Sequence, residues 1–159
     1  MADGIDAEYC TLRTEAVVSI PSSADPTTYA PLLCAGVTVF NGIRQMKIPP
    51  GSTVAIQGLG GLGHLALQYS RKMGYRTVAI SSSASKKEFA EKLGATDYVD
   101  TSKEDVGEVL RGMGGADLIV VTAPNPGVMG PLVKATAPLG KVLILARTYI
   151  SLPPIPRNR

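Results

Sequence analysis

Residues 58–63 read Gly-Leu-Gly-Gly-Leu-Gly, which has the spacing GxGxxG. They follow an apolar run at 53–57 (TVAIQ) and open an amphipathic segment, so a strand, a glycine turn and a helix are predicted. In this context Gly58 permits a tight turn, Gly60 lets a phosphate approach the backbone, and Gly63 lets the helix lie close to the sheet. The free amides and positive dipole end of the helix then bind a pyrophosphate. The predicted contacts are Gly58, Leu59, Gly60, Gly61, Leu62 and Gly63. The alternative is a glycine-rich turn that binds no ligand.

Polar residues at the end of the next predicted strand, 77–81 (TVAIS), indicate which dinucleotide would bind. An NAD site places Asp or Glu about 20 residues beyond the glycine turn, where it binds the ribose hydroxyls. No carboxylate precedes Glu88 in this region. Hydroxyl and ammonium donors favour a 2′-phosphate, whereas a carboxylate would repel it. The sequence therefore predicts NADP(H) rather than NAD(H), with contacts from Ser81, Ser82, Ser83 and Lys86. The alternative is that Ser85 and the lysines only cap the next helix.

Apolar runs and amphipathic segments alternate along most of the chain. Strands are predicted at 53–57, 77–81, 96–100, 117–123 and 141–146, with helices at 32–46, 61–73, 85–94, 103–112 and 127–137. Repeated strand–helix units predict an α/β fold with right-handed crossovers and one parallel sheet. For a Rossmann-type doubly wound fold, the expected strand order is 3-2-1-4-5. An additional strand is predicted at 8–20, and the Pro/Arg-rich segment 147–159 is predicted to be an extended tail.

Composition excludes several classes of protein. No apolar run approaches the length of a membrane span, and the first 15 residues have no apolar signal core. Cys10 and Cys34 lack CxxC spacing, so neither a disulfide scaffold nor a self-contained zinc finger is expected. The net charge of +3 comes without a basic stripe, so no nucleic-acid partner is expected. A reducing cytoplasm is the predicted location.

Three segments resemble the zinc-dependent alcohol dehydrogenases of the medium-chain dehydrogenase/reductase superfamily. They are APLLCAGVTVF (30–40), VAIQGLGGLGHLALQYSRKMG (54–74) and SSSASKKEFAEKLGATDYV (81–99). The serine-rich stretch is most similar to the NADP-dependent cinnamyl-alcohol-dehydrogenase branch. The resemblance implies a coenzyme-binding domain, reversible hydride transfer between a small alcohol and an aldehyde, and a catalytic zinc ion.

Individual residues match positions of that family. By resemblance, Cys34 corresponds to a catalytic zinc ligand and Thr38 to a residue beside the nicotinamide. Thr122 corresponds to a position that lines the cofactor. The 2′-phosphate region corresponds to Ser81, Ser82 and Lys86, with Ser83 and Lys87 as one-residue alternatives. His64, in the first turn of the helix after the glycines, is interpreted as a helix-start residue without a metal role.

The chain also departs from the family pattern. The family's first zinc cysteine, its Gly-His-Glu segment and its structural zinc lobe have no counterpart, so one matched ligand would not hold zinc tightly. We therefore expect residues 1–29 to be a remnant of a catalytic domain, 30–146 the NADP-binding domain truncated before a sixth strand, and 147–159 a tail. Little alcohol dehydrogenase activity is expected from the chain alone. The alternatives are an NADP-binding module without redox chemistry, or an enzyme that uses the same crevice for other chemistry.

The missing sixth strand has one further consequence. Without it, the strand at 141–146 would leave an open hydrogen-bonding edge. Either the following residues fold back over this edge, or a second copy pairs with it, so self-association to a homo-oligomer is predicted.

Overall fold

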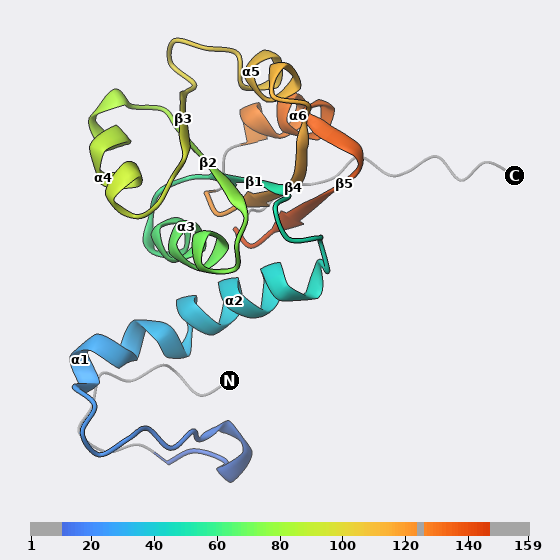
Figure 1. Cartoon of the computed structure of the whole chain (residues 1–159). Coiled ribbons are helices and arrows are strands. Elements are labelled where there is room, and N and C mark those ends of the chain that lie inside the picture. The colour runs from blue at the N-terminus through green and yellow to red at the C-terminus, as the bar shows by residue number, and fades with distance from the viewer. Residues whose placement is uncertain (1–10, 124–125, 147–159) are drawn as a thin grey trace, which may run out of the picture.

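A five-stranded parallel sheet forms the centre of the molecule in a computed structural model, which describes residues 11–123 and 126–146 (Figure 1). The strands are β1 (Thr53–Gln57), β2 (Arg76–Ser81), β3 (Asp97–Asp100), β4 (Ala116–Val121) and β5 (Thr136–Ile144). Their order is β3-β2-β1-β4-β5, and each neighbouring pair is parallel. The predicted order 3-2-1-4-5 is therefore confirmed, and the molecule has the Rossmann-type α/β fold.

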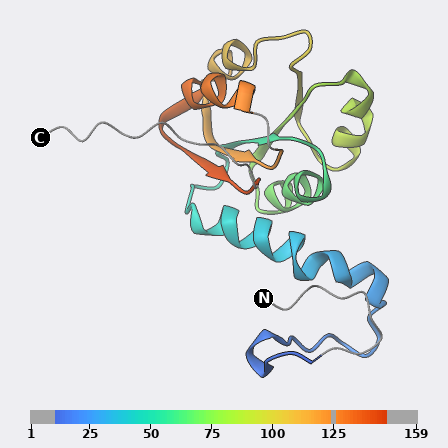
Figure 2. The same ribbon diagram turned by 180° about the vertical axis from the view of Figure 1, so that it is seen from behind.

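Helices cover both faces of this sheet, as Figures 1 and 2 show from opposite sides. They are α2 (Ala35–Gln45), α3 (Gly61–Lys72), α4 (Lys87–Lys92), α5 (Val106–Gly112) and α6 (Pro126–Lys134). The short helix α1 (Pro26–Tyr29) lies away from the sheet. Residues of α2, α3 and α4 pack on one face of the sheet, and residues of α5 and α6 pack on the other. Within the described ranges, no helix is both long and apolar enough to cross a bilayer.

The sheet is buried on both faces, which explains why its strands read as continuous apolar runs. In β1, Val54 and Ile56 belong to the core beneath α2 and α3, whereas Ala55 belongs to the core beneath α5 and α6. All three are fully buried. Alternate side chains of a strand point to opposite faces, so a two-sided core requires apolar residues at every position.

Glycines end two of the helices at the predicted places. Gly74 follows α3 with φ of 85°, and Gly94 follows α4 with φ of 101°. The amide of Gly74 donates to the carbonyl of Arg71 at 3.1 Å. Glycine adopts this left-handed conformation without steric cost, so the chain leaves each helix and turns directly into the next strand.

The predicted strand at 8–20 is wrong over the part that the structure describes. Residues 11–20 contain no strand; they contain one turn of 3-10 helix, η1 (Thr14–Ala16), and every residue is exposed. The apolar residues Val17 and Val18 are adjacent rather than alternating, and both are exposed. This segment lies away from the sheet in both views, so it has no strand to pair with (Figures 1 and 2). Cys10 lies outside the described residues.

The last helix and strand also differ from their predicted bounds. α6 ends at Lys134 instead of continuing to 137, and β5 begins at Thr136 instead of 141. The pairing of β5 with β4 shifts register between Ala116 and Leu118, and Leu139 has φ of 63° and is exposed. An irregularity of this kind lets a strand continue through a Pro-Leu-Gly sequence that local pattern assigns to a turn. The predicted tail at 147–159 lies outside the described residues.

One buried hydroxyl in α3 leads to a stability prediction. Ser70 is fully buried, and its Oγ has no hydrogen-bond partner. A buried polar group without a partner costs about 1–3 kcal/mol, and Ala is a better helix former than Ser. Ser70→Ala should therefore raise the free energy of unfolding by about 1 kcal/mol, measured by urea denaturation. Ser102→Ala is the matched control and should destabilise, because the Ser102 hydroxyl donates to Asp100 at 2.7 Å. A loss of stability in Ser70→Ala would contradict this account.

Candidate cofactor-binding site

The glycine turn connects β1 to α3 through a conformation that only glycine adopts easily. Gly58 has φ of 90°, and a Cβ built on it would lie 2.6 Å from the Cβ of Ala123. Its amide donates to the carbonyl of Ile80 at 3.0 Å, which ties the turn to the end of β2. A side chain at Gly58 would thus be strained by its backbone and would collide with the end of β4.

The outer side of the same turn is open. A Cβ built on Gly60 or on Gly61 would meet no atom within 4 Å. Gly60 is the N-cap of α3, and no side chain caps this helix. The first backbone amides of α3 therefore have no intrahelical acceptor and lie at the positive end of a 12-residue helix. These are the properties that bind a phosphate.

The inner side of the turn is closed. A Cβ built on Gly63 would lie 1.9 Å from the carbonyl oxygen of Gly58 and 3.0 Å from the Oγ1 of Thr122. Thr122 Oγ1 lies 2.9 Å from the Gln57 carbonyl oxygen and 3.0 Å from the Gly58 carbonyl oxygen, and its hydroxyl donates to them. Thr122 thus lies behind the turn and holds it in place. It is not among the residues that line the cavity described next.

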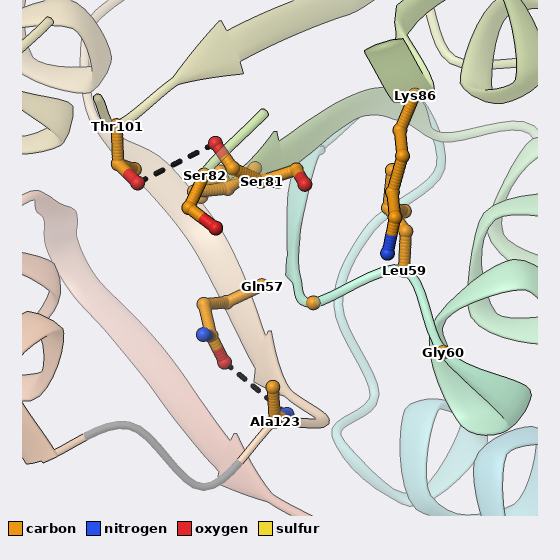
Figure 3. A pocket seen from close by; sticks show the side chains of 10 residues that line it. Gln57, Leu59, Gly60, Ser81, Ser82, Lys86, Thr101 and Ala123 are labelled. Carbon is orange, nitrogen blue, oxygen red and sulfur yellow. Dashed lines mark hydrogen bonds between the residues drawn. The ribbon is translucent and has the colours of Figure 1, made fainter. Parts of the chain in front are cut away.

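A cavity of about 330 Å³ opens beside this turn, at the carboxyl ends of the central strands (Figure 3). Its lining residues are Gln57, Gly58, Leu59, Gly60, Ile80, Ser81, Ser82, Lys86, Thr101 and Ala123. They come from the ends of β1, β2, β3 and β4 and from the segment after β2. In parallel α/β sheets, ligands bind in the crevice at this edge, where the strand order reverses.

Three of the predicted phosphate-binding polar residues line this cavity together. Ser81 ends β2, Ser82 follows it, and Lys86 is the last residue of the 3-10 helix η3 (Ala84–Lys86). In Figure 3 the Lys86 ammonium extends toward Leu59 at the glycine turn. The hydroxyls of Ser81 and Ser82 and the ammonium of Lys86 therefore lie at the same cavity as the uncapped backbone amides at the start of α3.

The two alternative residues have other positions. Ser83 does not line the cavity; its Oγ caps η3 by accepting from the Ser85 amide at 3.3 Å. The capping residue is therefore Ser83 and not Ser85. Lys87 lines a separate pocket with Asp100 and lies 3.9 Å from Glu91 in an ion pair.

Among the residues that the structure describes, no carboxylate lines the 330 Å³ cavity. The nearest acidic residue in sequence is Asp100, which ends β3 and faces the other pocket. Hydrogen bonds from the hydroxyl and the amide of Ser102 lower the pKa of Asp100, so it is a carboxylate at neutral pH. Asp100 lines that other pocket with Lys87, and it is also the register partner of Ser81 on the neighbouring strand.

Four of the lining residues were not predicted from the sequence: Gln57, Ile80, Thr101 and Ala123. Gln57 is only 7% exposed, and its Oε1 accepts from the Ala123 amide at 3.3 Å. The Thr101 hydroxyl donates to the Ser81 carbonyl at 3.4 Å. One signal was available, because Gln57 and Thr101 each lie at the end of a predicted strand. Only the sheet order shows that these two ends meet.

Two residues assigned by resemblance, Cys34 and Thr38, lie on α2 rather than at the cavity. Cys34 is the N-cap of α2 and is exposed, and Thr38 is exposed one turn later, with its amide donating to the Cys34 carbonyl. Zinc in a protein site takes at least three protein ligands. No group of three His, Cys, Asp or Glu side chains that could hold a metal occurs among residues 11–123 and 126–146. The described residues by themselves therefore do not supply the ligands of a zinc site.

His64 occupies the first turn of α3. Its Nδ1 lies 3.2 Å from the Gly60 carbonyl oxygen, and its amide donates to the same oxygen at 3.1 Å. The ring therefore contacts the start of its own helix, in agreement with its interpretation as a helix-start residue.

Comparison with known proteins identifies the family. A family model described as "Zinc-binding dehydrogenase" matches residues 61–157, which is more than half of the chain. The chain belongs to the zinc-binding dehydrogenase family. The match begins at the first residue of α3.

Curated relatives of this family member are alcohol dehydrogenases. The chain is 60% identical to the alcohol dehydrogenase patD of Penicillium expansum over 88% of its own length and 41% of the relative's. It is 41% identical to an alcohol dehydrogenase of Geobacillus stearothermophilus over 77% of its own length and 37% of the relative's. The chain thus spans about two fifths of the length of the relatives that it matches.

Two solved structures of dehydrogenases share the fold. The 2R,3R-butanediol dehydrogenase of Bacillus subtilis aligns with a TM-score of 0.66 and 27% identity, over 73% of this chain and 34% of that one. An alcohol dehydrogenase from Thermus sp. ATN1 aligns with a TM-score of 0.79 over 87% of this chain and 41% of that one. At 22% identity, the second similarity bears on the fold alone.

Proposed function

We propose that this member of the zinc-binding dehydrogenase family binds NADP(H) and forms the coenzyme-binding part of an enzyme that transfers hydride between a small alcohol and an aldehyde. One observation carries the cofactor assignment. The cavity joins the open glycine turn to Ser81, Ser82 and Lys86, and none of the described residues that line it is a carboxylate. When bound, the nicotinamide would accept or supply the hydride.

Each half of this cavity supports a different part of the cofactor. The open amides near Gly60 and Gly61 suit the pyrophosphate, which needs backbone donors and no Cβ in its path. Ser81, Ser82 and Lys86 suit the 2′-phosphate, which carries close to two negative charges and accepts strong hydrogen bonds from hydroxyl and ammonium donors. The same residues support assignment to the cinnamyl-alcohol-dehydrogenase-like branch.

The decisive experiment compares NADPH with NADH on the purified chain. Binding isotherms should show NADPH binding at least about tenfold more tightly at moderate salt, because a charge-assisted hydrogen bond contributes about 1.5–3 kcal/mol. Equal affinities would contradict the NADP preference while leaving a dinucleotide site. Absence of binding by either cofactor would favour a different use of the crevice.

We further propose that the chain alone has little or no alcohol dehydrogenase activity. Cys34 is exposed, and no set of three metal ligands occurs in the described part of the chain. A second candidate function, an NADP-binding module without redox chemistry, rests on the same observation. Mixing the chain with zinc, an aldehyde and NADPH, and following NADPH absorbance, tests whether the chain alone is inactive. Zinc-dependent turnover by this chain alone would contradict the proposal of inactivity.

Three organisational proposals accompany this function. Residues 30–146 would act as the cofactor-binding unit, since the first buried residue of the described chain is Gly36 on α2.

β5 ends the described sheet and pairs only with β4 within it, so a second copy would pair along β5. A clean monomer in size-exclusion chromatography at high concentration would contradict that pairing. A cytoplasmic location is in keeping with the exposed thiol of Cys34.

A further inference from the structure

We propose that Gln57 recognises the adenine base of the cofactor through two hydrogen bonds from its side-chain carboxamide. This inference rests on the proposed NADP(H) site and adds the residue that selects the base. No family position was assigned to Gln57 in the sequence, and the structure alone places it in the cavity.

The carboxamide of Gln57 has a defined orientation. Gln57 ends β1 and is 7% exposed, and its Oε1 accepts from the Ala123 amide at 3.3 Å. A backbone N–H can only donate, so the oxygen of the carboxamide must face Ala123. The nitrogen, Nε2, is turned away from Ala123 in Figure 3. No described residue accepts a hydrogen bond from Nε2, and the side chain lines the cavity, so this donor is available to a ligand.

The position of Gln57 in the cavity matches that of the base. Figure 3 shows Lys86 and the glycine turn on one side, and Gln57, Thr101 and Ala123 on the other. In the proposed site, the pyrophosphate occupies the first side, and Ser81 and Ser82, which would bind the 2′-phosphate, lie between the two sides in Figure 3. The ribose that carries the 2′-phosphate also carries the base, so the base lies beyond these serines, on the side of Gln57. Stacking against a base requires only apolar side chains, whereas Gln57 places a carboxamide at this position, which can also form hydrogen bonds with the base.

Adenine and a carboxamide are chemically complementary. The edge of adenine offers a donor, the N6 amino group, beside an acceptor, the ring nitrogen N7. A glutamine side chain offers an acceptor beside a donor, and Gln pairs with adenine in this bidentate way. The Oε1 of Gln57 has a second lone pair, so it can accept from N6 while it also accepts from Ala123. Hypoxanthine carries a carbonyl oxygen in place of the amino group, and two acceptors would then face each other.

Titration with NADPH and with the reduced form of nicotinamide hypoxanthine dinucleotide phosphate, which carries a 6-oxo group on the base in place of the 6-amino group, tests the inference. The unmodified chain should bind NADPH at least about fivefold more tightly, since a bidentate pair with the correct base gives about 1–3 kcal/mol of discrimination, or about 5- to 150-fold. Gln57→Leu should bring the two affinities within about twofold of each other. Gln68→Leu is the matched control, because the Gln68 amide donates to the His64 carbonyl outside the cavity, and it should keep the full preference.

Each outcome decides the inference. Equal affinities in the unmodified chain would overturn it without any variant, and so would a Gln57→Leu variant that retains the preference. If Gln57→Leu fails to fold, as circular dichroism would show, Gln57→Met provides a side chain of similar length for the same comparison. Failure of the unmodified chain to bind both nucleotides would overturn the proposed function itself, and this inference with it.

Discussion

Replacing Lys86 by glutamate should lower the affinity for NADPH by about 100-fold while changing the affinity for NADH by less than about fivefold. Lys86 supplies the cation in the cavity wall, and no carboxylate offsets it there. A charge-assisted hydrogen bond contributes about 1.5–3 kcal/mol, and the substituted carboxylate would also repel the 2′-phosphate. NADH lacks that phosphate, so it should be nearly indifferent to the change. Isothermal titration with both cofactors at two salt concentrations measures the effect.

The neighbouring lysine provides a matched control for this prediction. Lys87→Glu makes the same change in net charge one residue later, but Lys87 lines a different pocket and is exposed. It should alter NADPH affinity by less than about threefold, because exposed charges interact weakly through solvent at moderate salt. Equal losses in both variants would show that net charge, and not the position of Lys86, favours NADPH. The cofactor assignment would then lose its specific support.

Replacing Gly63 by alanine should have the largest effect on stability. The added Cβ would lie 1.9 Å from the Gly58 carbonyl oxygen, which belongs to the backbone of the glycine turn. Either α3 moves away from the sheet or the turn opens, and both changes disturb the core that Ala66 and Leu67 form beneath α3. Overpacking of this kind costs about 1–3 kcal/mol, and more where backbone must move. Urea denaturation should show a loss of at least about 2 kcal/mol, or no folded protein.

Gly61→Ala separates this packing effect from the general cost of losing a glycine. Gly61 is the first residue of α3, and a Cβ there would meet no atom within 4 Å. Stability should change by less than about 1 kcal/mol, since alanine is the better helix former. Loss of stability comparable to that of Gly63→Ala would mean that the turn requires glycine for reasons other than close packing.

In the middle of the chain, the strands and helices lie where the local pattern of apolar residues and glycines predicts them. β1 was predicted at 53–57 and occupies Thr53–Gln57, and α3 was predicted from Gly61 and begins there. Strands buried on both faces read as apolar runs, and glycines with positive φ end α3 and α4, so both signals are local in sequence. The order of the five strands is the one expected of a Rossmann-type doubly wound fold.

The two ends of the described chain do not follow their pattern. Residues 11–20 carry apolar residues but form no strand, because a strand needs a partner and none lies beside them. β5 begins five residues before its predicted start and passes through Pro138 and Gly140, because pairing with β4 outweighs local turn preference. Both errors have the same origin, since pairing partners are distant in sequence.

Local sequence was enough to predict the glycine turn, the succession of strands and helices, and the lack of a carboxylate between the second strand and Glu88. These features depend on neighbouring residues, so local spacing reveals them. Which polar residues share one cavity could not be predicted in this way: the folded chain adds Gln57 and Thr101 to the cavity, and it places Ser83 at the start of η3 as a cap. The reason is that the parallel sheet places the carboxyl ends of four strands together, and their register fixes which side chains meet.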